Sequence, residues 1–154
     1  QAITKIKKIV NNKVKLIIND FPEIAAKLNC DGCHIGQKDL SIQQTKQIMK
    51  SNKIIGVTCH NSKELALSAE KYGASYLAFG SFFKTKTKKT KFKANPKLLQ
   101  WAHKNLKTPV VAIGGINEEN YKLLLQNGAK YIACSSYIWK NSKYNPLKAL
   151  NQLK

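Results

Sequence analysis

Arginine is missing from this sequence, and acidic residues are scarce. All 27 basic residues are lysine, against eight aspartates and glutamates together, so the formal net charge is +19. Proteins that grip nucleic acid usually rely on arginine for bidentate contacts with bases and phosphates. The absence of arginine therefore argues against a dedicated nucleic-acid role. It favours a solvated lysine surface that attracts anionic substrates.

Long apolar runs and an export signal are also missing. No stretch approaches the roughly 18 consecutive apolar residues of a membrane span. Residues 1–9 lack the apolar core of a signal peptide and instead have the pattern of an amphipathic helix. The chain does not begin with Met, so we expect its natural start to lie upstream. These features predict a cytoplasmic protein with no membrane contact.

Cysteine is sparse, but one pair has a suggestive spacing. Cys30-Asp31-Gly32-Cys33-His34 matches the attachment pattern of c-type haem. Met49 is the only methionine that could serve as a second axial ligand, and no second cysteine pair completes a zinc site. Cys33 also fits a short buried strand, where cysteine acts as a small apolar residue. We interpret the spacing as coincidental and the cysteines as free thiols of a reducing compartment.

Strand and helix signals alternate along the whole chain. Aliphatic and β-branched runs predict strands over Val14–Ile18, Cys33–Ile35, Ile54–Val57, Tyr76–Phe79, Val110–Ile113 and Tyr131–Cys134. A helix opens the chain, and capping residues, prolines and glycines predict further helices over about Pro22–Leu28, Ser41–Met49, from Asn61 or Ser62 to Lys71, Pro96–Ala102, Asn117–Gln126 and Pro146–Leu153. This alternation predicts an α/β fold with a parallel sheet and right-handed crossovers.

The number of repeated units leaves the architecture open. No low-complexity linker divides the chain, so we expect one domain over residues 1–154. The βα units fit either an open doubly wound sheet or a (β/α)8 barrel without its first two strands. The chain is shorter than the roughly 200 residues at which such barrels usually start. Free sheet edges, however, would expose unpaired backbone.

Two of the three aspartates stand where a predicted strand ends. Asp20 closes the first strand, and Asp39 follows the second by a few residues. Adjacent parallel strands lie about 4.8 Å apart, so the two carboxylates can share one Mg²⁺ together with phosphate oxygens. The alternative is that both acids cap the helices that follow. Asn19 and Gln37 add neutral hydrogen-bonding groups at the same rim.

Later strand ends carry groups that suit phosphate or proton transfer. Thr58 and His60 end the third strand, and His60 is either a base or a hydrogen-bonded structural group. After the fourth strand, Thr85, Thr87 and Lys88 offer hydroxyl and ammonium groups to a phosphate. The alternative for these three is an ordinary solvated basic loop.

The last two strands are followed by Gly114-Gly115 and by Ser135-Ser136. In barrels, the loops at these two positions commonly bind phosphate. Glycines let backbone N–H groups approach the phosphate closely. Together the pairs predict a second phosphate site.

These motifs together resemble the thiamine phosphate synthase family, the thiamine-phosphate pyrophosphorylases. The similarity runs from about Lys15 to Ile138, with a family-like tail at 145–147, and is carried by Ile17–Asp20, Asp31–Asp39, Gly56–His60, Phe79–Lys88 and Val111–Ile116. Several motifs in one order are more specific than any single motif. The resemblance implies a (β/α)8 TIM barrel, apparently truncated at the N-terminus, in which this chain supplies strands three to eight.

The resemblance also implies a reaction. The family joins hydroxymethylpyrimidine diphosphate to thiazole phosphate and releases pyrophosphate, through a pyrimidine cation that the thiazole nitrogen captures. Such chemistry needs charge stabilisation on the departing diphosphate more than a strong base.

The roles implied by the resemblance fall on the residues already singled out. Asp20 and Asp39 would hold Mg²⁺, and Asn19 and Lys88 would contact the diphosphate. Thr58 stands where the family usually has serine and would contact the pyrimidine diphosphate, so Lys88 and Thr58 are the implied catalytic residues. The thiazole phosphate would be surrounded by Thr85, Thr87, Gly115, Ser135 and Ser136.

The sequence departs from the family pattern in places. The first two βα units are absent, and with them a Gln-x-Arg-x-Lys strand that grips the diphosphate and pyrimidine. Ser81 and Lys84 replace usual prolines, and Cys33 and Ser135 replace usual valines. The rival hypotheses are a thiazole tautomerase of the same superfamily and a non-catalytic basic module that binds nucleic acid. A homo-oligomer is compatible with the enzyme hypotheses.

Overall fold

The strands form one six-stranded sheet in which spatial order equals chain order, β1 to β6, and every neighbouring pair is parallel. The computed structural model describes residues 1–11, 13–50, 52–85 and 91–154. Its strands are β1 (Ile17–Asn19), β2 (Gly32–Ile35), β3 (Ile54–His60), β4 (Tyr76–Gly80), β5 (Val110–Ile113) and β6 (Tyr131–Ala133). Its helices are α1 (Ala2–Val10), α2 (Pro22–Lys27), α3 (Ile42–Met49), α4 (Lys63–Lys71), α5 (Pro96–Asn105), α6 (Tyr121–Gln126), α7 (Ser136–Trp139) and α8 (Pro146–Asn151).

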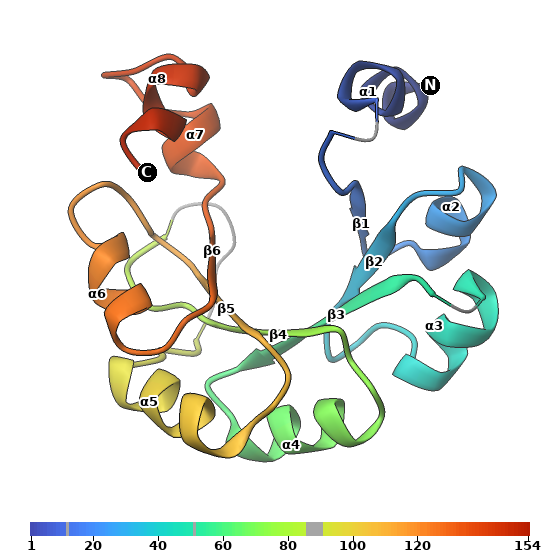
Figure 1. Cartoon of the computed structure of the whole chain (residues 1–154), viewed down its shortest axis with the longest axis horizontal. Coiled ribbons are helices and arrows are strands. Elements are labelled where there is room, and N and C mark those ends of the chain that lie inside the picture. Colours follow the sequence, from blue (N-terminus) through green and yellow to red (C-terminus); the bar gives the residue numbers. More distant parts are fainter. Residues whose placement is uncertain (12, 51, 86–90) are drawn as a thin grey trace.

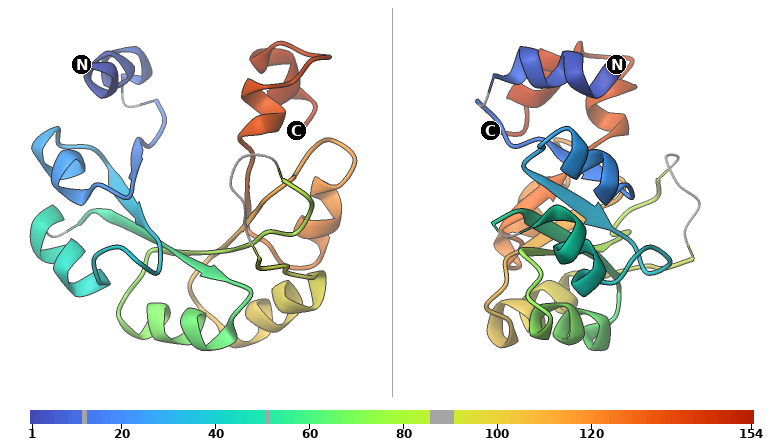
Figure 2. Two further views of the ribbon diagram at one scale, coloured as in Figure 1. Left: turned by 180° about the vertical axis from the view of Figure 1, so that it is seen from behind. Right: turned by 90° about the vertical axis from the view of Figure 1, so that its right-hand side faces the viewer.

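The sheet curves into an open trough, with helices α2 to α6 around its outer side (Figure 1). Strands β1 and β6 are its two edges, and α1 and the α7–α8 pair stand on opposite sides of the opening (Figures 1 and 2). The open doubly wound architecture is therefore wrong, because it requires a reversal of strand order and helices on both faces. The sheet is a parallel half-barrel. No described helix combines the length and apolar character needed to cross a membrane.

Helix starts follow the capping signals of the sequence. The Ser41 hydroxyl accepts a hydrogen bond from the N–H of Gln44, whose side chain in turn accepts from the N–H of Ser41. This reciprocal capping box satisfies two of the unpaired donors at the start of α3. Ser62 caps α4 and Asn145 caps α8 in the simpler one-sided way.

Several element bounds differ from the prediction. β1 begins at Ile17 rather than Val14, which is 58% exposed and makes no strand pair. β3 runs on to His60 because a register shift between Thr58 and His60 keeps its end paired with β4. α6 begins at Tyr121 rather than Asn117, since the N–H of Asn117 is bonded by the side chain of Asn120, the residue that precedes the helix. Helix α7 was not predicted.

The two faces of the sheet have different contents. Ile35, Ile55, Leu77 and Phe79 are at most 2% exposed and belong to the same core cluster as α5 residues such as Leu99. Successive residues of a strand point to opposite faces of the sheet. The residues that alternate with these four within each strand therefore point to the other, concave face. That face carries polar groups on the central strands, and these form the centre of the candidate site.

Candidate active site at the carboxyl ends of the strands

A hydrogen-bonded row of three side chains crosses the concave face. Nδ1 of His34 on β2 lies 3.0 Å from the hydroxyl of Tyr76 on β4, and Nε2 of His34 lies 2.8 Å from the hydroxyl of Thr58 on β3. The rings of His34 and Tyr76 are also stacked, with their centroids 5.5 Å apart. Thr58, predicted from sequence, is therefore held by two residues that sequence reasoning missed.

A glycine makes this row possible. Gly56 on β3 stands opposite both His34 and Tyr76 in the strand register. A Cβ atom at Gly56 would lie 1.9 Å from Cζ of the Tyr76 ring. The tyrosine ring therefore occupies the space of the missing side chain and lies across β3 to reach β2.

The tautomer of His34 decides the direction of the hydrogen bonds in the row. Burial, and to a smaller extent the nearby Cys33, raises the pKa of Tyr76 to about 12, so the hydroxyl keeps its proton. If Tyr76 donates to Nδ1 of His34, the proton on the imidazole lies on Nε2 and is donated to Thr58 Oγ1. The Thr58 hydroxyl then has its own hydrogen available for a ligand oxygen.

The carboxylates of Asp20 and Asp39 lie on the first two strand ends. Asp20 follows β1 with a left-handed backbone, φ 68°, and its N–H donates to the carbonyl of His34. Asp39 closes a turn after β2, where Oδ2 accepts a 2.7 Å hydrogen bond from the N–H of Gly36. Asp39 does not cap α3, because the side chain of Ser41 does so, and Phe21 rather than Asp20 directly precedes α2.

Both carboxylates act on the same buried thiol. Burial, followed by the negative charge of Asp20, raises the pKa of Cys33 to about 11, and Asp39 acts in the same direction. The two acids therefore share one neighbourhood at the carboxyl ends of β1 and β2. Oxygen donors of this kind suit Mg²⁺. Among the described residues, no three or more His, Cys, Asp or Glu side chains are grouped to hold a metal by themselves.

The other predicted residues that the structure describes lie at or after the carboxyl ends of the strands. Asn19 is exposed at the end of β1, and Gln37 donates to the carbonyl of Thr58. Thr85 is half-buried in the loop after β4, whereas Thr87 and Lys88 lie outside the described residues. Gly115 follows β5, and Ser135 and Ser136 follow β6. Because β5 and β6 are paired in register, these last groups belong to neighbouring strand ends.

His60 packs on the segment that leads from β4 to α5. Its ring stacks on Phe92, with centroids 4.0 Å apart and an angle of 20° between the planes. Burial lowers the pKa of His60 and so favours the uncharged ring. Next to it, the side-chain amide of Asn61 donates to the carbonyl of Lys93.

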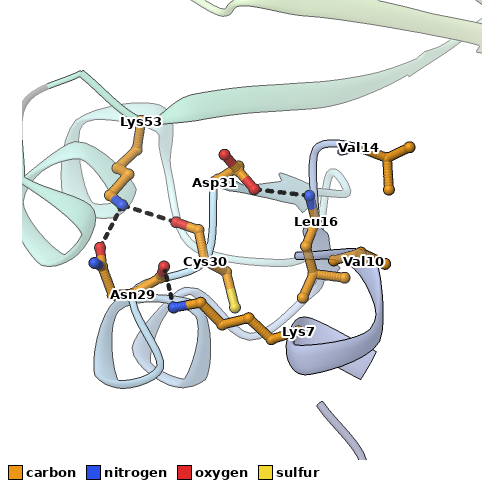
Figure 3. A pocket seen from close by; sticks show the side chains of 8 residues that line it. All are labelled: Lys7, Val10, Val14, Leu16, Asn29, Cys30, Asp31 and Lys53. Carbon is orange, nitrogen blue, oxygen red and sulfur yellow. Dashed lines mark hydrogen bonds between the residues drawn. The ribbon is translucent and has the colours of Figure 1, made fainter. Parts of the chain in front are cut away.

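A cavity at the opposite end of the sheet is structural. It measures about 320 Å³ and lies between α1 and the amino ends of β1, β2 and β3 (Figure 3). Lys7 donates to the carbonyls of Leu28 and Asn29, and Lys53 donates to the side chain of Asn29 and the carbonyl of Cys30. These lysines neutralise the carbonyl end of α2. Cys30 and Cys33 are buried free thiols, so they form no disulfide here.

Comparison with known proteins identifies relatives of the chain. The family model described as thiamine monophosphate synthase matches residues 1–138. The thiamine-phosphate synthase of Pelagibacter ubique is 56% identical over 151 residues, which are 97% of this chain and 72% of that protein. The thiamine-phosphate synthase of Rhodospirillum centenum is 43% identical over 128 residues, covering 83% of this chain and 62% of that protein.

A solved structure agrees with these sequence matches. Thiamine phosphate pyrophosphorylase from Pyrococcus furiosus superposes with a TM-score of 0.86 at 31% identity, over 97% of this chain and 71% of that chain. From family model, sequence identity and fold alike, the chain belongs to the thiamine monophosphate synthase family.

Proposed function

We propose that the protein condenses hydroxymethylpyrimidine diphosphate with thiazole phosphate to form thiamine phosphate and pyrophosphate. The observation that carries this proposal is the meeting of Asp20, Asp39 and the Thr58 hydroxyl at the carboxyl ends of three neighbouring strands. Catalytic residues of parallel barrels stand at this end of the strands. Two carboxylates beside a hydroxyl donor suit a diphosphate bound with a divalent cation.

Asp20 and Asp39 are the residues that would hold Mg²⁺, with diphosphate oxygens completing its ligand shell. When bound, Mg²⁺ supplies charge stabilisation for the departing pyrophosphate. The turn at Gly36 keeps the Asp39 carboxylate in place through its N–H. Because one Asp39 oxygen accepts that hydrogen bond, the other is left for the metal.

Thr58 acts on the leaving group in this proposal. Its hydroxyl accepts from His34 and donates to a diphosphate oxygen, where negative charge grows as the carbon–oxygen bond breaks. A donor fixed before the reaction costs no reorganisation during it. Lys88 and Asn19 would bind the same diphosphate, and Lys88 would add a positive charge. Thr85, Thr87, Gly115, Ser135 and Ser136 would hold the phosphate of the thiazole substrate.

The finer architecture is also a proposal. We place β1 to β6 as strands three to eight of a (β/α)8 barrel, with residues 1–154 belonging to one domain. The curved sheet with its two edges on either side of one opening supports this (Figure 1). We further propose the cytoplasm as the compartment, since four free thiols suit a reducing environment.

The test is formation of thiamine phosphate by the full-length protein, with and without Mg²⁺. Asp39→Asn keeps an acceptor for the Gly36 N–H but removes the charge, so we expect turnover to fall by about 10²-fold or more. Asp31→Asn is the matched control, since Asp31 lies at the amino end of β2 and should leave turnover unchanged. No product from the folded wild-type protein would overturn the proposal, and the thiazole tautomerase reaction would then be tested.

A further inference from the structure

The turn after β5 has an unusual backbone. Gly114 and Gly115 have φ values of +95° and +68°, which only glycine adopts without strain. The incoming part of the β4–α5 loop packs directly on this pair. A Cβ at Gly114 would lie 2.6 Å from Cβ of Ser81, and one at Gly115 would lie 2.5 Å from the carbonyl oxygen of Lys84. Both backbone conformation and close packing therefore require glycine here.

The side chain of Asn120, which lies outside the turn, fixes the peptide between Gly115 and Ile116. The amide nitrogen of Asn120 donates a 3.1 Å hydrogen bond to the carbonyl of Gly115, while its Oδ1 accepts a 3.0 Å bond from the N–H of Asn117. In a trans peptide the carbonyl and the next N–H point in opposite directions. Because the Gly115 carbonyl faces Asn120, the N–H of Ile116 faces away from it.

Two backbone donors of the turn have no acceptor in the part of the chain that the structure describes. Over the described residues, neither the N–H of Gly115 nor that of Ile116 donates to another protein group. Unused backbone donors at a glycine turn are suited to an anion, and the cost of orienting them has been met by Asn120 before any ligand arrives.

We propose that Asn120 is a positioning residue that presents the Gly115 and Ile116 N–H groups to the phosphate of the thiazole substrate. This inference rests on the proposed function, which places Gly115 at that phosphate. Asn120 itself touches no reacting atom. It acts by holding one peptide plane, so its removal should weaken the binding of one substrate and spare the other.

The decisive pair of variants is Asn120→Asp and Asn117→Asp in the full-length protein. Aspartate at 120 can still accept from Asn117 and still suits the residue before a helix, but it cannot donate to the Gly115 carbonyl. Aspartate at 117 adds the same charge to the same turn and keeps the acceptor that Asn117 offers to the N–H of Glu119. The two variants therefore differ in the hydrogen bond under test.

We expect Asn120→Asp to raise the KM for thiazole phosphate by about tenfold, the effect of one lost hydrogen bond and a misplaced donor pair. The KM for the pyrimidine diphosphate and kcat should change by less than about twofold, and Asn117→Asp should behave like wild type. An equal rise in both variants would attribute the effect to charge and overturn the proposal. So would equal changes in both substrate KM values.

A second readout does not depend on turnover. Inorganic phosphate, titrated into ¹⁵N-labelled protein, should shift the amide signals of Gly115 and Ile116 in the wild type and in Asn117→Asp, but much less in Asn120→Asp. If these amides do not respond in the wild type, the inference is wrong even where thiamine phosphate forms. If they respond while no thiamine phosphate forms, the proposed function fails and the role of Asn120 in phosphate binding stands.

Discussion

Among single residues, Tyr76 has the widest influence on the site. Its hydroxyl lies 3.0 Å from Nδ1 of His34, and Nε2 of the same ring lies 2.8 Å from the Thr58 hydroxyl, so the imidazole links Tyr76 to a hydroxyl on another strand. Tyr76→Phe keeps the ring over Gly56 and removes only this oxygen. We expect a loss of about 1 kcal/mol in the free energy of unfolding and a fall of about tenfold in kcat, read from urea unfolding and steady-state kinetics.

The matched control for Tyr76→Phe is Tyr72→Phe. Tyr72 is 44% exposed, next to the C-terminal end of α4, and its hydroxyl donates to no described group. It should change neither stability nor kinetics. Unaltered kcat in Tyr76→Phe would contradict the hydrogen-bond direction that we propose for Thr58.

Asp31 gives a prediction on pH. The N–H of Leu16, and then the ammonium of Lys15, holds the pKa of Asp31 below its usual value. A carboxyl whose pKa is lowered by folding stabilises the fold above its unfolded pKa, about 3.9, and loses that contribution as pH falls through the folded pKa. Asp31→Asn should therefore cost about 1 kcal/mol at pH 7.

The same deficit should shrink below about pH 4, because the carboxyl of the unfolded wild type then takes up a proton, and it should vanish as the pH falls through the lower pKa of the folded state. Urea unfolding of both proteins at pH 7, 5 and 3.5 measures this difference. A deficit that stays constant across the series would mean that the side chain acts through shape and neutral hydrogen bonds alone.

At the scale of elements, the end of β3 anchors the long loop. The register shift presents His60 to Phe92, and Asn61 holds the next carbonyl, at Lys93. Ser81 pairs with the same segment from the other side, accepting from Ala94 and donating to Phe92. Bulges of this kind commonly re-aim a side chain next to an active site.

Phe92→Ala should loosen this anchor. We expect a loss of about 1 kcal/mol of stability from the aromatic pair and a fall of about three- to tenfold in kcat/KM, since the loop carries Thr85 and the predicted phosphate ligands. Phe92→Tyr keeps the stack and should restore both values. If Phe92→Ala loses stability but retains wild-type kcat/KM, the stack is structural only.

Most elements could be predicted because each is encoded locally. Apolar runs mark the strands, and Ser41, Ser62 and Asn145 mark helix starts by chemistry that the structure confirms. The start of α6 was misplaced because Asn117 looks like a capping residue in the sequence, whereas in the structure its own N–H is bonded by the side chain of Asn120 and the helix begins after Asn120. Helix α7 is too short to show a periodic signal.

The site was only partly predictable for a different reason. Strand-end residues such as Asp20, Asp39 and Thr58 stand out in the sequence. His34 and Tyr76 lie inside apolar runs, and their meeting depends on the register of three strands and on Gly56 between them. A histidine inside a buried strand was the available signal, but its partner lies 42 residues away.

For the whole molecule, the excess of lysine predicts a dependence on salt. A net charge of +19 raises the local concentration of phosphorylated substrates, and this attraction is screened over about 10 Å at 0.1 M salt and about 3 Å at 1 M. The KM values of both substrates should rise several-fold between about 0.05 and 0.5 M NaCl, with kcat nearly constant. KM values that do not respond to salt would show that the lysine surface has no part in substrate capture.

The sequential order of the strands has a consequence for how the chain could be divided. The strand ends follow one another from β1 to β6 in chain order. The proposed metal ligands Asp20 and Asp39 and the proposed diphosphate ligands Asn19 and Thr58 therefore precede Gly73. The proposed diphosphate ligand Lys88 and all the proposed thiazole phosphate ligands follow it. A backbone break in the short turn between α4 and β4 would therefore place most of the proposed metal and diphosphate ligands on one polypeptide and the proposed thiazole phosphate ligands on another. If mixing the two fragments restored activity, it would show that β3 and β4 can pair again between separate polypeptides.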